Sequence, residues 1–456
     1  MTHYSNLTTQ MELDFEALAV ESIELSLEAI DQAAELATQI PNEQRQWQTY
    51  LNALALFSFE QWLAERSPEM RVNKEECSLF QPAMANSIEA VFNLKVHGFK
   101  LCLIATGSLM DEEVTLPRAV IDLPEFVPHF YVLIDVREEQ EMAVIRGFLP
   151  YNQLLEKRAR VNVTADEDWT YQFPLTWFDG SLDRLLLNLR CLEPSAIPLP
   201  AVPDDRLTQL SRMRSQLEAL LPQLQSPERQ LWQVLSWEQG AVVLTNPELL
   251  NWLYQLQTQD EAQPDISLTP YLSDLLQLLT QKAVNVRRWL WNELDELAQE
   301  FSWQLLPSFA GANAMRSLTQ EVRSPAEEFE GIVRELQHNN VEISTEARGA
   351  YRNLQLGETP LRLYALTWLL LSESVPEWTL LLIVGTPSQT SLPVGLKLRL
   401  SDQTGVLVEQ ELDTDENHPY FFTSVVGTQD EKFIATVSLG SGIEQTLPPF
   451  SFTLER

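Results

Sequence analysis

Residues 127–150 read VPHFYVLIDVREEQEMAVIRGFLP, and this stretch decides the fold of the N-terminal part of the chain. Two runs rich in β-branched and aromatic residues, 130–136 and 142–149, flank the polar segment REEQE. Such runs are typical of strands, and a short polar segment between them is typical of a hairpin turn. The runs at 91–107 and 169–178 add further strands, so we expect a small antiparallel sheet or barrel.

A helical hairpin is predicted before this sheet. Apolar residues in 15–40 recur at spacings of mostly three and four, which indicates an amphipathic helix that Pro41 ends. Asn42 is then a suitable N-cap for a second helix that ends before Pro68. Residues 1–193 are therefore predicted to form an N-terminal α+β domain.

The rest of the chain divides by composition. Residues 194–205, PSAIPLPAVPDD, contain four prolines and predict a semi-rigid linker. Helical spacing dominates 206–345, a central helical segment, and 346–359 reads as a second linker. About seven β runs follow in 360–456, which is typical of a C-terminal antiparallel β-sandwich. The predicted class is an α+β multidomain protein.

Composition limits the function. The chain has 456 residues, 45% of them hydrophobic, which excludes a disordered protein. Its formal net charge of -34 disfavours direct binding to nucleic acid or an anionic membrane and favours a protein partner with a basic surface. The three cysteines are far apart, no signal peptide is recognisable, and the apolar runs are too short for a membrane span. We therefore expect a cytoplasmic protein without a cofactor; the oligomeric state stays open.

Residues 284–307, VNVRRWLWNELDELAQEFSWQLLP, carry the candidate binding residues. The spacing predicts a single helix over this stretch. An apolar stripe from Val286 to Leu305 forms its core face, Trp289 and Trp291 lie beyond the two borders of this stripe, and Trp303 lies on the solvent side. Either another layer of the protein covers these tryptophans or they form a partner surface. Arg287 and Arg288 stand beside them, and Trp and Arg are enriched at binding hot spots.

Motifs for metal binding or catalysis are weak. Asp413, Asp415 and Asn417 match the first three ligand positions of a calcium loop, but the match breaks at His418 and Ser424, so a solvated acidic turn is the alternative. The five histidines are not at metal-ligand spacing, and we interpret His97 and His129 as structural. The sequence has no P-loop, GxGxxG or GxSxG motif.

Several segments resemble an uncharacterised cyanobacterial family, a domain of unknown function numbered 1822. The resemblance is carried by ERSPEM, the 127–154 stretch, FPLTWFDGSLDRLLLNLRCL, VNVRRWLWNELDEL and SLPVGLKLRLSDQTGVLVEQEL. It implies a cyanobacterial, cytoplasmic protein without an assigned activity, from a family whose members resemble regulatory companions more than enzymes and are associated with neighbouring sigma-factor genes. It assigns no functional residues.

Three hypotheses about function follow. The first is a non-enzymatic interaction or regulatory protein that binds a basic protein partner, with a sigma-class factor as the concrete version. The second is an enzyme whose carboxylates and histidines come together only in the fold. The third is an assembly module that docks through an exposed edge of the C-terminal β-sandwich.

Overall fold

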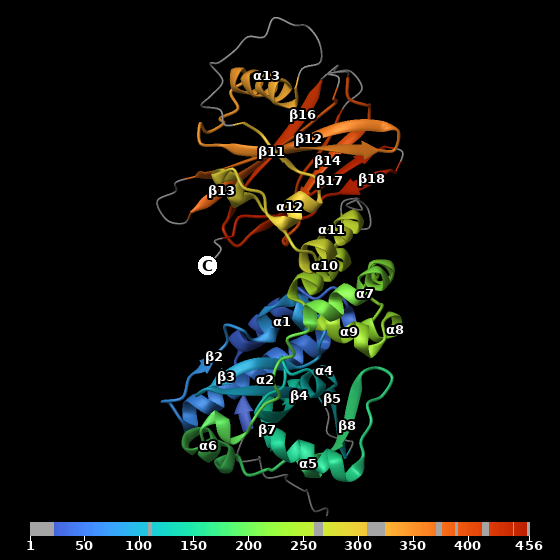
Figure 1. Ribbon diagram of the computed structural model, residues 1–456. Coiled ribbons are helices and arrows are strands. Elements are labelled where there is room, and N and C mark those ends of the chain that lie inside the picture. The colour runs from blue at the N-terminus through green and yellow to red at the C-terminus, as the bar shows by residue number, and fades with distance from the viewer. Residues whose placement is uncertain are drawn as a thin grey trace, which may run out of the picture. The chain divides into compact units, whose positions relative to one another are not determined.

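The computed structural model describes residues 22–107, 112–259, 268–307, 324–370, 376–387, 391–412, 419–440 and 442–453. The chain forms two compact units. Unit 1 consists of Met1–Asp204 and Gln223–Thr258, and unit 2 of Asp205–Pro222 and Gln259–Arg456. Both units combine helices with sheets, so the α+β class predicted from the sequence is confirmed (Figure 1).

The predicted hairpin lies inside the main sheet of unit 1. Its strands are β6 (Phe130–Arg137) and β7 (Met142–Pro150), which pair antiparallel from Phe130↔Pro150 to Arg137↔Met142. Glu141 adopts a left-handed backbone (φ 51°) and closes the turn between them. Seven of the eight residues of β6 are buried, so both faces of this strand are covered.

The sheet has six strands in the order β1-β7-β6-β4-β3-β2. We predicted a small antiparallel sheet or barrel, and the sheet departs from this at one pair, because β4 pairs parallel with β6. The chain between these two strands crosses back to the same end of the sheet, and parallel pairing requires a long connection of this kind. The other strands of unit 1 are β1 (Ser22–Glu24), β2 (Val72–Asn73), β3 (Val91–Val96), β4 (Phe99–Thr106), and the separate pair β5 (Glu113–Pro117) and β8 (Thr170–Pro174).

The helical hairpin consists of α1 (Leu27–Thr38) and α2 (Glu43–Arg66), and α2 packs against β4 and β6. Asn42 caps α2 as predicted, since its side chain accepts a hydrogen bond from the amide of Arg45 at 3.0 Å. The first helix is shorter than predicted. Residues 22–24 are a strand beside β7, and the helix begins only after its N-cap Ser26. Residues 15–21 lie outside the described residues.

Residues 223–258 belong to unit 1, although the sequence places them in a central helical segment. Side-chain hydrogen bonds attach them: Asn42 Nδ2 donates to the carbonyl of Pro227 at 2.8 Å, and the Tyr254 hydroxyl donates to the carbonyl of Gln39 at 2.6 Å. The remaining helices of unit 1 are α3 (Pro82–Ala85), α4 (Ala119–Asp122), α5 (Tyr151–Val161), α6 (Leu182–Cys191), α8 (Leu231–Val234), α9 (Trp237–Leu244), α10 (Pro247–Thr258), and the 3-10 turns η1 (Ser78–Phe80), η2 (Glu138–Gln140), η3 (Leu175–Trp177) and η4 (Pro194–Ala196).

Unit 2 contains two sheets that contribute to one hydrophobic core. The order is β10-β11-β12-β13-β16 in the first sheet and β15-β14-β17-β19-β9 in the second, where β18 also pairs with β17. All pairs are antiparallel except β19 with β9. The strands are β9 (Val284–Asn285), β10 (Gln304–Leu305), β11 (Arg348–Leu356), β12 (Thr359–Leu370), β13 (Glu377–Gly385), β14 (Leu396–Ser401), β15 (Val406–Glu411), β16 (Tyr420–Thr428), β17 (Lys432–Leu439), β18 (Glu444–Thr446) and β19 (Phe450–Ser451).

The predicted second linker, 346–359, is wrong. Residues 348–356 form β11, which pairs along its whole length with β12. Polar residues made this strand look like a linker in the sequence. In a strand, side chains at alternate positions face opposite sides, and here Ala350, Leu354 and Leu356 face the core.

Helices complete unit 2. On the outer side of the first sheet, α13 (Pro325–His338) covers a second apolar cluster that includes Phe329 and Tyr364 (Figure 1). Helix α11 packs on β14 and β17. The helices are α7 (Arg206–Leu220), α11 (Leu268–Thr280), α12 (Glu296–Glu300) and α13 (Pro325–His338), and the 3-10 turns are η5 (Leu221–Leu224), which crosses the boundary between the units, and η6 (Val286–Trp291).

Candidate functional site

We predicted one helix over the tryptophan-rich stretch 284–307, and this prediction is wrong. The stretch runs through β9, the 3-10 turn η6, helix α12 and β10. The breaks come from left-handed residues, Asn292 (φ 58°) and Ser302 (φ 60°), and from Asp295, whose carboxylate caps the amide of Ala298 at 2.9 Å. Asn and Asp stabilise caps and left-handed backbone better than a helix interior, so local polar bonds override the apolar spacing here.

Two of the three tryptophans belong to the core of unit 2. Trp289 is fully buried and Trp303 is 3% exposed, and their rings lie 5.5 Å apart between centroids. Trp303 also meets Phe450 edge-on at 5.7 Å. The expectation that Trp303 faces solvent is therefore wrong: the turn at Ser302 directs its ring inward. Trp289 does not form part of an accessible partner surface.

Trp291 behaves differently. Its side chain is 58% exposed, and the guanidinium of Arg287 lies over its ring at 5.2 Å from the centroid. The same guanidinium lies 5.9 Å from the ring of Phe452. A cation above an indole face is favourable and holds the ring in one orientation. The structure thus brings Trp291 and Arg287 together, and we call these two residues the Trp291 face.

Arg288 lies in a different environment from Arg287. It lines a hollow of about 340 Å³ with Lys282 and the acidic residues Asp295, Glu296 and Glu300. Asp295 is used structurally, because its second carboxylate oxygen accepts from the amide of Asn285 at 2.8 Å. Of the four predicted partner-binding residues, Trp291 and Arg287 are in contact with each other.

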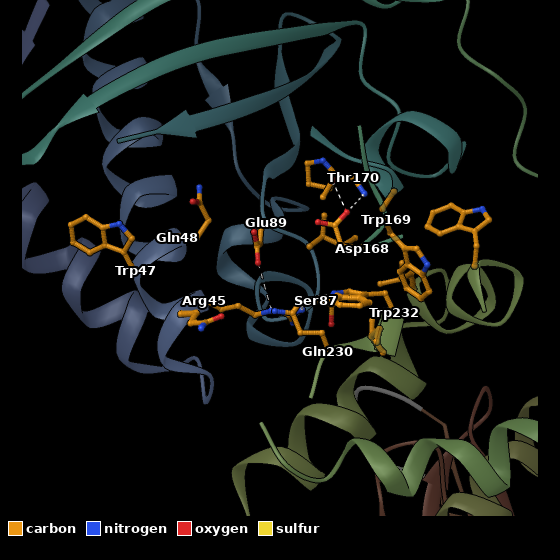
Figure 2. Close-up of a pocket in the computed structure, with 17 residues that line it drawn as sticks. Arg45, Trp47, Gln48, Ser87, Glu89, Asp168, Trp169, Thr170, Gln230 and Trp232 are labelled. Carbon is orange, nitrogen blue, oxygen red and sulfur yellow. Dashed lines mark hydrogen bonds and ion pairs between the residues drawn. The ribbon is translucent and has the colours of Figure 1, made fainter. Parts of the chain in front are cut away.

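A second candidate site lies in unit 1. A pocket of about 380 Å³ is lined by α2, the 87–89 segment, the turn before β8, and helices α8 and α9. Figure 2 shows Trp47 at one end, Trp169 and Trp232 at the other, and Arg45 and Glu89 between them. The pocket combines aromatic walls with charged side chains, as small-molecule sites do.

Arg45 is the charged centre of this pocket. Its side chain is only 11% exposed, and burial lowers the pKa of its guanidinium although Glu89 acts in the opposite direction. Glu89 Oε1 lies 3.8 Å from Arg45 Nε and is itself 49% exposed. Arg45 Nη2 donates a long hydrogen bond of 3.5 Å to Gln230 Oε1. That oxygen also accepts from the Trp232 indole at 2.9 Å, which fixes the amide between them.

Trp169 is held in place by unusual local geometry. It has a positive φ of 61°, which a bulky side chain rarely adopts. The carboxylate of Asp168 accepts from the Thr170 amide at 3.2 Å and hydroxyl at 2.7 Å, which organises this turn. The ring of Trp169 meets the ring of Trp237 edge-on, with 5.3 Å between centroids. It also lies against Gly240, where an added Cβ atom would come within 2.0 Å of the Trp169 indole. Only glycine leaves room for the ring.

His97 lies in a turn and His129 in the interior of unit 1. His97 and Gly98 both adopt positive φ and form the tight turn between β3 and β4. His129 is buried, and its Nδ1 accepts a hydrogen bond from the amide of Lys100 at 2.8 Å. Burial lowers the pKa of His129, so the neutral ring is favoured.

The predicted calcium ligands Asp413, Asp415 and Asn417 lie outside the described residues. Within the described part of the chain, no group of three or more histidine, cysteine or acidic residues is placed to hold a metal ion. Across the same residues, no helix is long and apolar enough to cross a membrane. Cys77, Cys102 and Cys191 are free thiols, and burial raises the pKa of Cys77 to about 11.

The unit 1 pocket was not predicted from the sequence. Its wall comes from segments that lie far apart in the sequence, around Arg45, Trp169 and Trp237. The local signals are the aromatic residues of EDWTY and of RQLWQVLSWEQG, whose Gly240 is unusual within a helix. Nothing in the sequence pairs these segments.

These features define an α+β protein with an exposed tryptophan–arginine face and a tryptophan-lined pocket. The chain matches the family described as Protein of unknown function (DUF1822) over residues 23–447 and belongs to it, which confirms the family resemblance. No curated protein and no solved structure matches the chain significantly.

Proposed function

We propose that this chain is a non-enzymatic interaction protein that binds a protein partner with a basic surface through the Trp291 face. The observation that carries the proposal is the 58% exposure of Trp291 under the guanidinium of Arg287. Burying an aromatic side chain of this size on binding contributes about 1.5–3 kcal/mol. Because Arg287 already orients the ring, little conformational freedom is lost when a partner covers it.

The charge of the chain supports the kind of partner. Its net charge of -34 produces a negative field that attracts a basic surface from a distance. Glu293, two residues after Trp291, is exposed, and so are Glu296 and Glu300 on α12. These exposed acidic side chains follow Trp291 closely in the sequence, which fits a basic partner. A sigma-class transcription factor is the first partner to test, on the resemblance described above.

The alternative of strand addition has weaker support. The edge strand β15 carries Glu409 and Glu411, and Lys397 on the neighbouring strand pairs with Glu411 at 2.9 Å. Charged side chains on an edge strand oppose pairing with another chain. The enzyme alternative asks for carboxylates together with His97 or His129 in one deep pocket. The unit 1 pocket has Glu89 and Asp168 in its lining, and neither histidine.

The test uses the full chain as bait in a lysate of its source organism, at low and high salt. Each retained protein is then purified and its affinity measured by titration. We expect a basic partner whose binding weakens with salt, and an affinity about tenfold lower for Trp291→Ala, which corresponds to about 1.4 kcal/mol.

Trp47→Ala is the matched control, because Trp47 is 53% exposed but belongs to unit 1. This variant should bind the partner as the wild type does. Equal affinity of the wild type and Trp291→Ala for every retained protein would overturn the proposal, and so would the absence of any retained partner.

A further inference from the structure

The guanidinium of Arg45 has too few acceptors for its burial. Among the described residues, its one hydrogen bond is the 3.5 Å contact with Gln230, an oxygen that it shares with Trp232. Its Nε atom is buried and has no hydrogen-bond partner. A guanidinium has five N–H donors, and a buried cation without acceptors is costly. Arg45 is therefore prepared for an acceptor that the chain itself does not supply.

Glu89 does not fill that place. Its carboxylate stands 3.8 Å from Arg45 Nε, beyond hydrogen-bond distance, and about half of its side chain is exposed. A carboxylate that neutralises a buried arginine normally makes two parallel hydrogen bonds of about 2.7–2.9 Å. The Arg45 fork thus keeps donors free on the side of the pocket.

The tryptophans of the unit 1 pocket indicate which chemical group accompanies an acceptor for Arg45. Trp169, Trp232 and Trp237 line the same pocket as Arg45. The guanidinium of Arg118 lies over the Trp237 ring, 4.2 Å from its centroid, so one face of this ring is already covered. Trp169 is kept there by the left-handed backbone and by Gly240, an arrangement that costs conformational energy. Tryptophan faces stack on flat rings. The volume of about 380 Å³ is within the range of small-ligand sites.

We propose that the unit 1 pocket binds a small organic monoanion, a carboxylate joined to a flat ring. The carboxylate accepts two hydrogen bonds from Arg45, and the ring lies among Trp169, Trp232 and Trp237. Glu89 and Asp168 in the lining repel a second negative charge, which favours a carboxylate over a phosphate. This site is independent of the Trp291 face, which belongs to unit 2.

The experiment titrates the full chain with naphthalene-2-carboxylate, benzoate and indole-3-acetate by calorimetry. Naphthalene-2-carboxamide is the neutral match, naphthalen-2-ylmethylamine the cationic match, and inorganic phosphate tests the anion without a ring. We expect at least one ring carboxylate to bind at least about tenfold tighter than the amide, the amine or phosphate.

Variants place the binding in this pocket. Arg45→Gln is expected to weaken carboxylate binding by about tenfold or more and to leave the affinity for the amide unchanged. Arg45→Lys keeps the positive charge but loses the two parallel donors, so its carboxylate affinity should lie between those of the wild type and Arg45→Gln. Arg160→Gln is the control, since Arg160 is a 77% exposed arginine of the same unit. Melting temperatures confirm that each variant is folded.

Clear results overturn the proposal. If the amide binds as tightly as the carboxylate, the pocket recognises rings and not anions. Tighter binding of the amine would make it an aromatic cage for cations. Equal carboxylate affinity in wild type and Arg45→Gln, or no binding of any ring carboxylate at millimolar concentration, would remove the site. If Arg45→Gln does not fold, the affinities of the wild type for the carboxylate, the amide and the amine still show whether the pocket selects a ring carboxylate.

Discussion

The carboxylate of Asp274 and the guanidinium of Arg399 form a buried bidentate ion pair that joins α11 to the second sheet of unit 2. Arg399 Nε donates to Oδ2 at 2.7 Å and Nη2 to Oδ1 at 3.2 Å, and Asp274 is fully buried. The hydroxyls of Ser401 and Thr436 also donate to this carboxylate, at 3.0 and 2.9 Å. Burial lowers the pKa of Arg399, but the hydrogen bonds and charge of Asp274 outweigh it and raise this pKa.

Asp274→Ala should strongly destabilise unit 2. It leaves the Arg399 cation buried without an acceptor, and breaking one partner of a buried pair costs about 3–5 kcal/mol. The free energy of unfolding in urea measures this loss.

Asp274→Leu combined with Arg399→Met is the matched control. It removes both charges, so the loss should be much smaller than for Asp274→Ala. If the double variant is as unstable as the single one, the uncompensated charge is not the cause.

The tryptophans of 286–303 should separate into two classes in stability measurements. Trp289→Ala removes a fully buried ring and should cost about 3–5 kcal/mol of unfolding free energy. Trp291→Ala removes an exposed ring and should change it by no more than about 0.5 kcal/mol. Equal losses in the two variants would mean that Trp291 also supports the core.

The spacing of apolar residues predicted a helix or strand correctly where those residues are buried in the fold as the spacing implies. The hairpin 130–149 and helix α2 lie almost where the sequence places them, because the apolar residues that define their patterns are buried in the fold. The stretch 284–307 fails for the opposite reason. Its apolar spacing fits a helix, but Asn292, Asp295 and Ser302 form local bonds and turns that divide it.

Contacts between distant segments could not be predicted in the same way. Residues 223–258 look like the neighbouring helices in sequence, and hydrogen bonds such as Asn42 to Pro227 decide that they belong to unit 1. The pocket around Arg45 depends on the same long-range pairing. Of the predicted partner-binding residues, Trp291 and Arg287 are in contact in the structure, and Trp289 is buried, which its place in the sequence did not show.

Gly240→Ala should destabilise unit 1 by about 1–3 kcal/mol, because the new methyl group overlaps the ring of Trp169. In a Trp169→Ala background the same substitution should cost nothing, since the overlap is gone. Urea unfolding of the four proteins gives the coupling energy between the two positions.

Gly331→Ala is the control for the change from glycine to alanine itself. Gly331 lies in α13 with no atom near the position of a Cβ, so this variant should be more stable by about 0.5–1 kcal/mol. A stabilising Gly240→Ala would contradict the placement of Trp169 against the helix.

Tyr364 should make unit 2 sensitive to alkaline pH. Its ring is buried, and burial raises the pKa of its hydroxyl to about 12 from an ordinary value of 10.0, with Arg362 opposing the shift and the negative charge of Glu328 adding to it. The folded state therefore holds this proton more tightly than the unfolded state. The resulting stability is fully present below pH 10 and is lost as the pH rises toward 12. The loss is on the order of 2 kcal/mol.

Tyr364→Phe tests this prediction because it removes the titrating group and keeps the ring. The variant is expected to be less stable than the wild type at neutral pH, since it loses the 3.3 Å hydrogen bond to Glu328. Between pH 10 and 12 its unfolding free energy should fall less steeply, so that the two curves converge. The pKa values of Tyr171 and Tyr420 are also raised to about 12, but these residues are present in both proteins and cancel in the difference. Parallel curves over this range would show that Tyr364 titrates alike in the folded and unfolded chain.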